Sequence, residues 1–196
     1  LTTWIAAHPP AAAGLEISGP WQVTFDPQTG GPGKVEFKQL DDWSKRPEEG
    51  IRDYSGTAIY QTVFNSPQTT AGRRSMLDLG KVAVMARVQL NGKDLGILWK
   101  PPYRVDVTDT LKAGENTLKI AVVNLWVNRL IGDAAKPEDS KRDGEGRLQS
   151  WPDWVLSGGS PSGGRRSFVT IPLWKSDEER VPSGLLGPVS IISAEK

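Results

Sequence analysis

Cysteine is absent from this sequence of 196 residues. Its absence excludes disulfide bonds, thiolate nucleophiles and zinc sites built on cysteine. Histidine occurs once, as His8 near the N-terminus, so a nucleophile–histidine triad is not expected. The charges nearly balance, with 24 Lys and Arg against 23 Asp and Glu, and no apolar run approaches the roughly 20 residues of a membrane-spanning helix. We expect neither nucleic acid nor a membrane as a partner.

The N-terminal stretch "LTTWIAAHPPAAAG" has neither an initiator Met nor the basic region that begins a signal peptide. It predicts a processed or excised piece of a longer chain. The length suits one domain over residues 1–196, with residues 1–18 as an N-terminal extension. A chain of this length buries roughly 70% of the surface that it exposes when unfolded, so it needs no covalent or metal staple.

Glycine, proline and tryptophan are abundant, with 21, 15 and 8 residues. Apolar and polar residues alternate with period two in many short segments, among them "WQVTF", "YRVDV" and "TLKIAVV". Helical patterns are nearly absent, and turn signals recur every 8 to 12 residues or so. The pattern predicts an all-β fold, an antiparallel β-sandwich of the jelly-roll type.

Strand polarity predicts which connections meet. Asn91-Gly92 is a strong signal for a tight hairpin, because both turn positions need positive φ. If successive strands run antiparallel, residues 40–55, 99–102 and 124–170 share one end of the sandwich. The last of these is expected to be a long loop insertion, and a loop of this length is uncommon unless it is functional or disordered.

This end gathers aromatic and polar side chains. Sugars present flat C–H faces to tryptophan and tyrosine, and their hydroxyl groups pair with amides, guanidinium groups and carboxylates. Trp43 maps to the same end. The candidate sugar-binding residues are Trp99, Tyr103, Trp126, Asn128, Arg129, Asp133, Trp151 and Trp154.

Structural roles for the same residues stay open. Trp99 and Trp126 can cap the core with Tyr103 beneath them, and Arg129 can pair with Asp133, four positions on, to brace the loop. Trp151 and Trp154 can pack the loop onto the sandwich or onto another domain. We expect no cofactor and no catalytic pair among the loop carboxylates, although jelly-roll modules often hold a structural calcium ion.

The run from "YSGTAIYQTVFNSP" through "VQLNGKDLG" to "PPYRVDVTDTLKAGEN" resembles the galactose-binding-like, sugar-binding domain of family 2 glycoside hydrolases. The segments "NLWVNRLIGD" and "PSGLLGPVSI" are similar to the C-terminal domain of family 106 α-L-rhamnosidases. The resemblance implies a non-enzymatic jelly-roll domain beside a larger catalytic domain in a secreted or periplasmic bacterial enzyme. By the same resemblance, Asn128, Arg129 and Asp133 are candidates for a loop at the active-site rim.

Three functions follow as alternatives. The first is a carbohydrate-binding or accessory domain of a rhamnosidase-like enzyme that acts on plant or microbial polysaccharide. The second is a purely structural domain, with its tryptophans as anchors against a catalytic domain. The third is a small autonomous glycosidase that uses two loop carboxylates.

Overall fold

The computed structural model describes residues 14–67, 73–161 and 163–194. Within them strands dominate and helices are short. In chain order the elements are β1 Leu15–Glu16, β2 Trp21–Phe25, η1 Pro27–Thr29, β3 Lys34–Phe37, η2 Trp43–Lys45, α1 Glu49–Arg52, β4 Thr57–Ser66, β5 Arg74–Asp78, β6 Lys81–Ala83, β7 Met85–Leu90, β8 Lys93–Leu98, β9 Arg104–Asp106, β10 Gly114–Val123, α2 Val127–Ala134, α3 Asp153–Leu156, β11 Gly184–Gly187 and β12 Ser190–Ala194.

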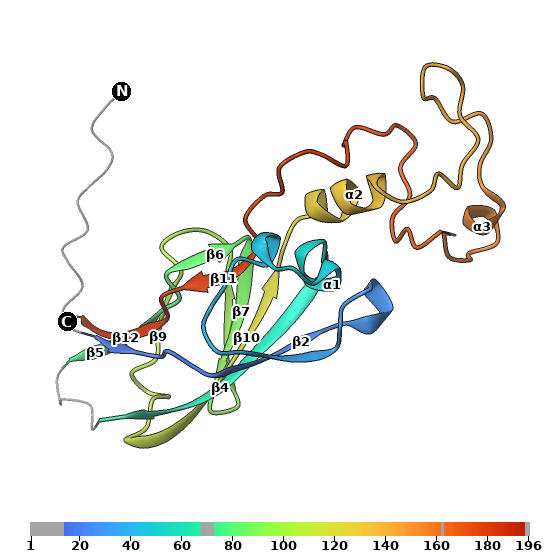
Figure 1. Cartoon of the computed structure of the whole chain (residues 1–196). Coiled ribbons are helices and arrows are strands. Elements are labelled where there is room, and N and C mark those ends of the chain that lie inside the picture. Colours follow the sequence, from blue (N-terminus) through green and yellow to red (C-terminus); the bar gives the residue numbers. More distant parts are fainter. Residues whose placement is uncertain (1–13, 68–72, 162, 195–196) are drawn as a thin grey trace, which may run out of the picture.

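The strands form a six-stranded sheet in the order β3-β2-β4-β10-β7-β8, and a four-stranded sheet in the order β1-β12-β5-β9. A short pair, β11 and β6, completes the set. All of these strands pair antiparallel with their neighbours. The predicted all-β antiparallel sandwich is confirmed (Figure 1).

The core lies between the two main sheets and follows the predicted alternation. In β2, Trp21, Val23 and Phe25 are fully buried, whereas the intervening residues are partly exposed. Trp43 is also fully buried: it stacks on Tyr60 at 6.3 Å between ring centroids and donates a hydrogen bond of 2.6 Å to the Tyr60 hydroxyl. The ring of Trp43 therefore belongs to the core, because η2 turns it inward.

The predicted hairpin joins β7 to β8. Asn91 has φ 51° and Gly92 has φ 82°, the left-handed conformations that the turn requires. The Asn91 side chain also donates to the carbonyl oxygen of Thr110 and to Asn116 Oδ1, both at 2.8 Å. The turn is therefore fixed to the neighbouring connection as well as to its own strands.

The register of the six-stranded sheet confirms that several connections meet at one end, called here the upper end. Thr57, where β4 begins, pairs with Val123, where β10 ends, and Val123 also pairs with Met85 of β7. Leu98, at the end of β8, lies opposite Ala86. Residues 99–102 and the chain after Val123 consequently leave the sheet at the same end, with β7 between the two strands.

Residues 124–183 form an arm that projects from the upper end and returns to β11 (Figure 1). The expectation of an irregular loop over 124–170 is wrong at its start, where α2 forms one side of the arm. The N-terminal extension predicted for residues 1–18 lies mostly outside the described residues. Its described part includes β1, which pairs with β12.

Candidate functional site

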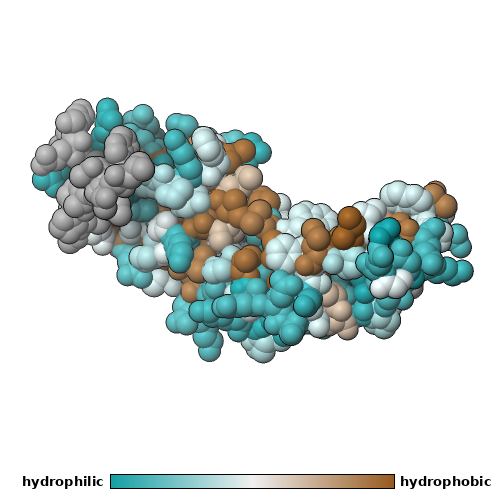
Figure 2. Space-filling model, turned by 90° about the horizontal axis from the view of Figure 1, so that it is seen from above, coloured by the Kyte–Doolittle hydropathy of each residue, from teal (hydrophilic) through white to brown (hydrophobic). Residues whose placement is uncertain are grey.

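Large apolar side chains are exposed at the upper end, although the core beneath them is closed. Trp99 is 66% exposed and Trp126 62%, and Leu125 and Met85 are exposed beside them at 51% and 37%. We call Met85, Trp99, Leu125 and Trp126 the upper apolar surface. Figure 2 shows apolar residues gathered on this side of the molecule, from the sandwich toward the arm.

The base of the arm is fixed to residues 40–55 by hydrogen bonds. Asn124 donates to the carbonyl oxygen of Tyr54 at 2.7 Å and accepts from the backbone N–H of Gly56 at 3.0 Å. Ser55 Oγ donates to the carbonyl oxygen of Leu125 at 3.2 Å. These bonds hold the backbone that carries Leu125 and Trp126, so the two exposed side chains stand on a rigid support.

The side chain of Asn128 is not available at the surface, where a sugar would bind. It is fully buried, its Nδ2 donates to the Val181 carbonyl at 2.7 Å and to Ser183 Oγ at 2.8 Å, and its Oδ1 accepts from the Val181 backbone N–H at 2.9 Å. The assignment of Asn128 to a sugar is therefore corrected. The side chain joins α2 to the returning chain because a buried amide needs partners of its own.

Arg129 and Asp133 are buried as well, at 5% and 2% exposure. Arg129 Nη1 lies 3.6 Å from Asp133 Oδ1, and Asp133 Oδ2 accepts from the backbone N–H groups of Arg166 and Ser167 at 2.8 and 2.7 Å. Ser167 Oγ adds a third hydrogen bond of 2.7 Å. The expected role in sugar recognition is corrected for both, since the pair braces the arm.

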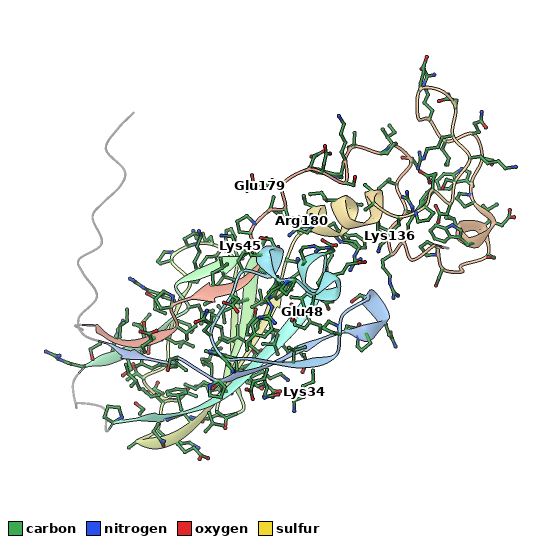
Figure 3. The ribbon with its side chains drawn as sticks, viewed as in Figure 1. Lys34, Lys45, Glu48, Lys136, Glu179 and Arg180 are labelled. Atoms are coloured by element: carbon green, nitrogen blue, oxygen red, sulfur yellow. The ribbon has the colours of Figure 1, made fainter. Side chains whose placement is uncertain are left out.

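A second buried carboxylate anchors the returning chain. Asp53 is 1% exposed and accepts hydrogen bonds from Arg180 and Arg52. Burial works against ionisation of Asp53, but the two guanidinium groups outweigh it and hold the pKa of this carboxyl below its ordinary value. Figure 3 shows Arg180 on the returning chain beside α2, with Lys136 at the end of that helix. Lys136 Nζ adds an exposed ion pair to Glu49 at 2.6 Å.

The remaining aromatic candidates have different environments. Tyr103 is buried and its hydroxyl donates to the Val84 carbonyl at 2.9 Å, so its assignment to a sugar is also corrected. Trp151 and Trp154 lie on either side of Phe168, with ring centroids 5.5 and 5.7 Å away. The second pair meets edge to face. The three rings pack the tip of the arm onto itself, and Trp151 keeps 54% exposure.

Neither a metal centre nor a membrane span emerges from the part of the chain that the structure describes. No three His, Asp or Glu side chains of residues 14–67, 73–161 and 163–194 gather as a metal ion would require. A structural calcium ion stays a prediction without an identified ligand set. Within the same residues no helix is long and apolar enough to cross a bilayer.

Sequence reasoning missed the contacts that shape this end. Asp53 and Arg180 are separated by 127 positions, and no local pattern links them. Met85 is a single apolar residue at the start of β7, and only the register, in which Ala86 lies opposite Leu98, brings it next to Trp99. The fold and this end together define a galactose-binding-like β-sandwich that carries an exposed apolar end and a braced arm.

The chain belongs to the family described as glycosyl hydrolase 2 galactose-binding domain-like, which matches residues 42–152. A protein of Formosa agariphila, provisionally named a beta-glucuronidase, is 44% identical over 179 residues, which are 90% of this chain and 15% of that protein. A beta-glucuronidase of Paenibacillus borealis is 27% identical over 155 residues, 69% of this chain and 26% of that protein.

Solved structures show the same architecture. A rhamnosidase from Novosphingobium sp. PP1Y matches with a TM-score of 0.75 and 33% identity, over 94% of this chain and 15% of that one. The beta-D-glucuronidase of Dictyoglomus thermophilum, at 18% identity and a TM-score of 0.58, shares the fold over 96% of this chain and 29% of its own. The chain thus spans a small part of each relative, and its resemblance to the sandwich of glycoside hydrolases is confirmed.

Proposed function

We propose that this chain serves as a non-catalytic accessory domain of a bacterial glycoside hydrolase, and that its upper apolar surface docks the catalytic domain of that enzyme. The observation that carries the proposal is the exposure of Trp99 and Trp126, at 66% and 62%, on one end of a closed sandwich. Exposed apolar groups that gather on one surface mark interaction sites, and tryptophan is the residue most enriched among interface anchors.

The expected gain from docking is substantial. Covering the exposed part of one of these indole rings removes on the order of 100 Å² or more from water, which is worth roughly 2–4 kcal/mol before the cost of association. Trp126 stands on a backbone held by Asn124, so this anchor loses little conformational entropy on binding. A rigid domain contact is therefore the favoured use of the surface.

Carbohydrate binding at the same surface is the weaker alternative. A sugar site needs polar groups that converge on the hydroxyls beside the aromatic platform. Asn128, Arg129 and Asp133, the residues expected to supply them, are turned inward and engaged with the arm. Trp99 and Trp126 are left without those partners, which favours a protein surface over a sugar.

The substrate of the whole enzyme is part of the proposal. Relatives named for rhamnosidase and glucuronidase activity support an enzyme that cleaves rhamnosides or glucuronides in plant or microbial polysaccharide. Its location outside the cytoplasm, in the periplasm or the medium, stays a prediction. The chemistry is assigned to the catalytic domain, because the buried carboxylates at the base of the arm, Asp53 and Asp133, are committed to the arm's own contacts.

The decisive experiment measures docking directly. The chain and the remaining domains of the enzyme that carries it are produced separately, and their affinity is measured by calorimetry. Replacing both Trp99 and Trp126 by alanine should weaken the complex by roughly 1000-fold, since two anchors of about 2 kcal/mol each sum to about 4 kcal/mol. Val63→Ala is the matched control, because Val63 is 57% exposed but lies toward the opposite end of β4.

Other results would reject docking at this surface or assign the chain a different function. Equal affinity of the double variant and the unchanged chain would reject the upper apolar surface as the docking site. A glycan array provides the second readout. Binding that Trp126→Ala abolishes would make this surface a sugar site, and hydrolysis of an aryl rhamnoside or glucuronide by the isolated chain would establish the autonomous enzyme instead.

A further inference from the structure

A cavity of about 310 Å³ opens within the arm, between α2 and the returning chain. Leu130 and Asp133 of the helix line one side, and Leu173, Trp174 and Lys175 line the other. The volume lies at the lower end of the roughly 300–1,000 Å³ typical of ligand sites. The cavity therefore suits one ring-sized ligand rather than an extended chain.

The lining combines an apolar wall with converging charges. Trp174 is half-buried, and with Leu130 and Leu173 it provides the kind of surface on which the C–H face of a sugar ring packs. Arg142 and Arg165 enter from a third side, with Glu138 between them. Small-molecule sites are built in this manner, with a largely apolar cleft and a few polar groups that fix orientation.

The two carboxylates of the cavity are already neutralised. Glu138 pairs with Arg142 at 3.1 Å and with Arg165 at 3.7 Å. Burial works against ionisation of Glu138, but the two arginines outweigh it and hold its pKa below the ordinary value. Asp133 is engaged by Ser167 and lies 3.6 Å from Arg129. Neither acid is therefore left to repel an anion or to bind a cation.

Lys175 is the cation without such a partner. Within the described residues no carboxylate lies at ion-pair distance from its ammonium group, and the nearby Glu178 accepts instead from the backbone N–H of Lys175 at 2.8 Å. By contrast Arg142 and Arg165 are occupied, because beyond Glu138 they also donate to backbone carbonyls of the arm. The lining holds three cations and two acids, and Lys175 is the one of these three cations without an ion-pair partner within the described residues.

We propose that this cavity binds a pyranose that carries one anionic group, a carboxylate or a sulfate ester, with the ring against Trp174 and the anion at Lys175. The proposal goes beyond the docking function, since none of the upper apolar surface lines the cavity. It gives the arm a recognition role for acidic units of a polysaccharide.

The test uses the full chain and three small probes that differ in charge. Glucuronate carries a carboxylate, glucose 6-sulfate carries a sulfate ester, and glucose is the neutral reference. Binding is followed by NMR chemical shifts of the tryptophan indole N–H groups. At least one anionic probe should bind in the millimolar range and about fivefold more tightly than glucose, the contribution expected of a partly exposed ion pair. The probe that binds identifies the anion.

Two variants and two controls decide the assignment. Lys175→Gln should reduce the affinity of the anionic probe to that of glucose, and Trp174→Ala should abolish binding of the sugar ring. Lys93→Gln removes an exposed lysine of the β7–β8 hairpin and should change nothing. Trp99→Ala should also leave binding intact, so failure of the docking proposal and failure of this one are told apart.

Three results would overturn the proposal. They are equal affinity for glucose and both anions, anion binding that Lys175→Gln leaves unchanged, and no binding of any probe at tens of millimolar. Because Lys175 is exposed, its replacement should not affect folding, and an unchanged melting temperature would make its result decisive.

Discussion

The sandwich and the arm of this protein are stabilised in different ways. The main hydrophobic core, as far as the described residues show it, extends to Val122 and resumes at Leu185, so it contains no residue of the arm. The arm is joined to the sandwich mainly by buried polar contacts, among them Asp53 with Arg180 and Asn124 with Tyr54. Its apolar packing is local, around Phe168.

Because they are stabilised differently, the sandwich and the arm should differ in how readily they open. Apolar burial is non-directional and tolerates small movements, whereas a buried ion pair is favourable only in good geometry and costs desolvation. The sandwich should therefore unfold as one cooperative unit. The arm should open locally at lower free energy, which suits a segment that carries a binding cavity.

The largest effect is expected from damage to the sandwich core. Trp21→Ala removes a fully buried ring that meets Tyr60 edge to face at 6.2 Å, and it should cost about 3–5 kcal/mol of unfolding free energy. Chemical denaturation followed by circular dichroism measures the loss. Trp99→Ala is the matched control: the same chemical change at a 66% exposed position should stay within about 0.5 kcal/mol. Similar losses for both variants would contradict the description of Trp99 as a surface group.

A smaller and more local effect is expected at the base of the arm. Asp53→Asn leaves Arg180 and Arg52 without their carboxylate, which should cost about 2–3 kcal/mol. Amide hydrogen exchange should show lost protection in α2 and the returning chain, while the strands of the six-stranded sheet stay protected.

The exposed ion pair of Arg87 and Asp94, at 2.6 Å, provides the control for this effect. Asp94→Asn should leave exchange unchanged in both regions, because a solvated pair on the sheet surface contributes little. Loss of protection throughout the sandwich in Asp53→Asn would show that the arm and the core do not open independently.

The strands and turns of the sandwich could be predicted from the sequence because the patterns that indicate them are local. Trp21 alternates with polar neighbours, and Asn91-Gly92 has the composition of a tight hairpin, so strands and turns could be recognised without knowing their partners. Strand polarity alone then located Trp99 and Trp126 at one end. Tyr103 could have been placed inside by the same alternation, since it shares a face with Val107.

The arm was harder because its contacts are long-range. Asn128 and Asp133 look like surface residues until the chain near Val181 and Ser167 returns to meet them. The helix that carries them begins at Val127. Its capping residue, Trp126, makes no side-chain capping bond, and the helix contains Gly132, so its local signal was weak. Polar residues in a segment that returns on itself can satisfy one another, and composition alone does not reveal this.

The smallest expected effect is a difference between the arm and the sandwich in how amide protection depends on pH. The pKa of Asp53 is lower in the folded protein than its ordinary value of about 4, so its contribution to stability is complete above that value and is lost as the pH falls through the folded pKa. Glu138, whose pKa is also lowered, acts in the same direction within the arm. As the pH falls below about 4, the amides of α2 should therefore lose protection before those of β10, in exchange experiments corrected for intrinsic rates. Asp53→Asn should flatten this dependence, leaving only the part due to Glu138. Simultaneous loss of protection in both elements would instead mean that acid unfolds the sandwich directly, and that the carboxylates of the arm do not control its opening.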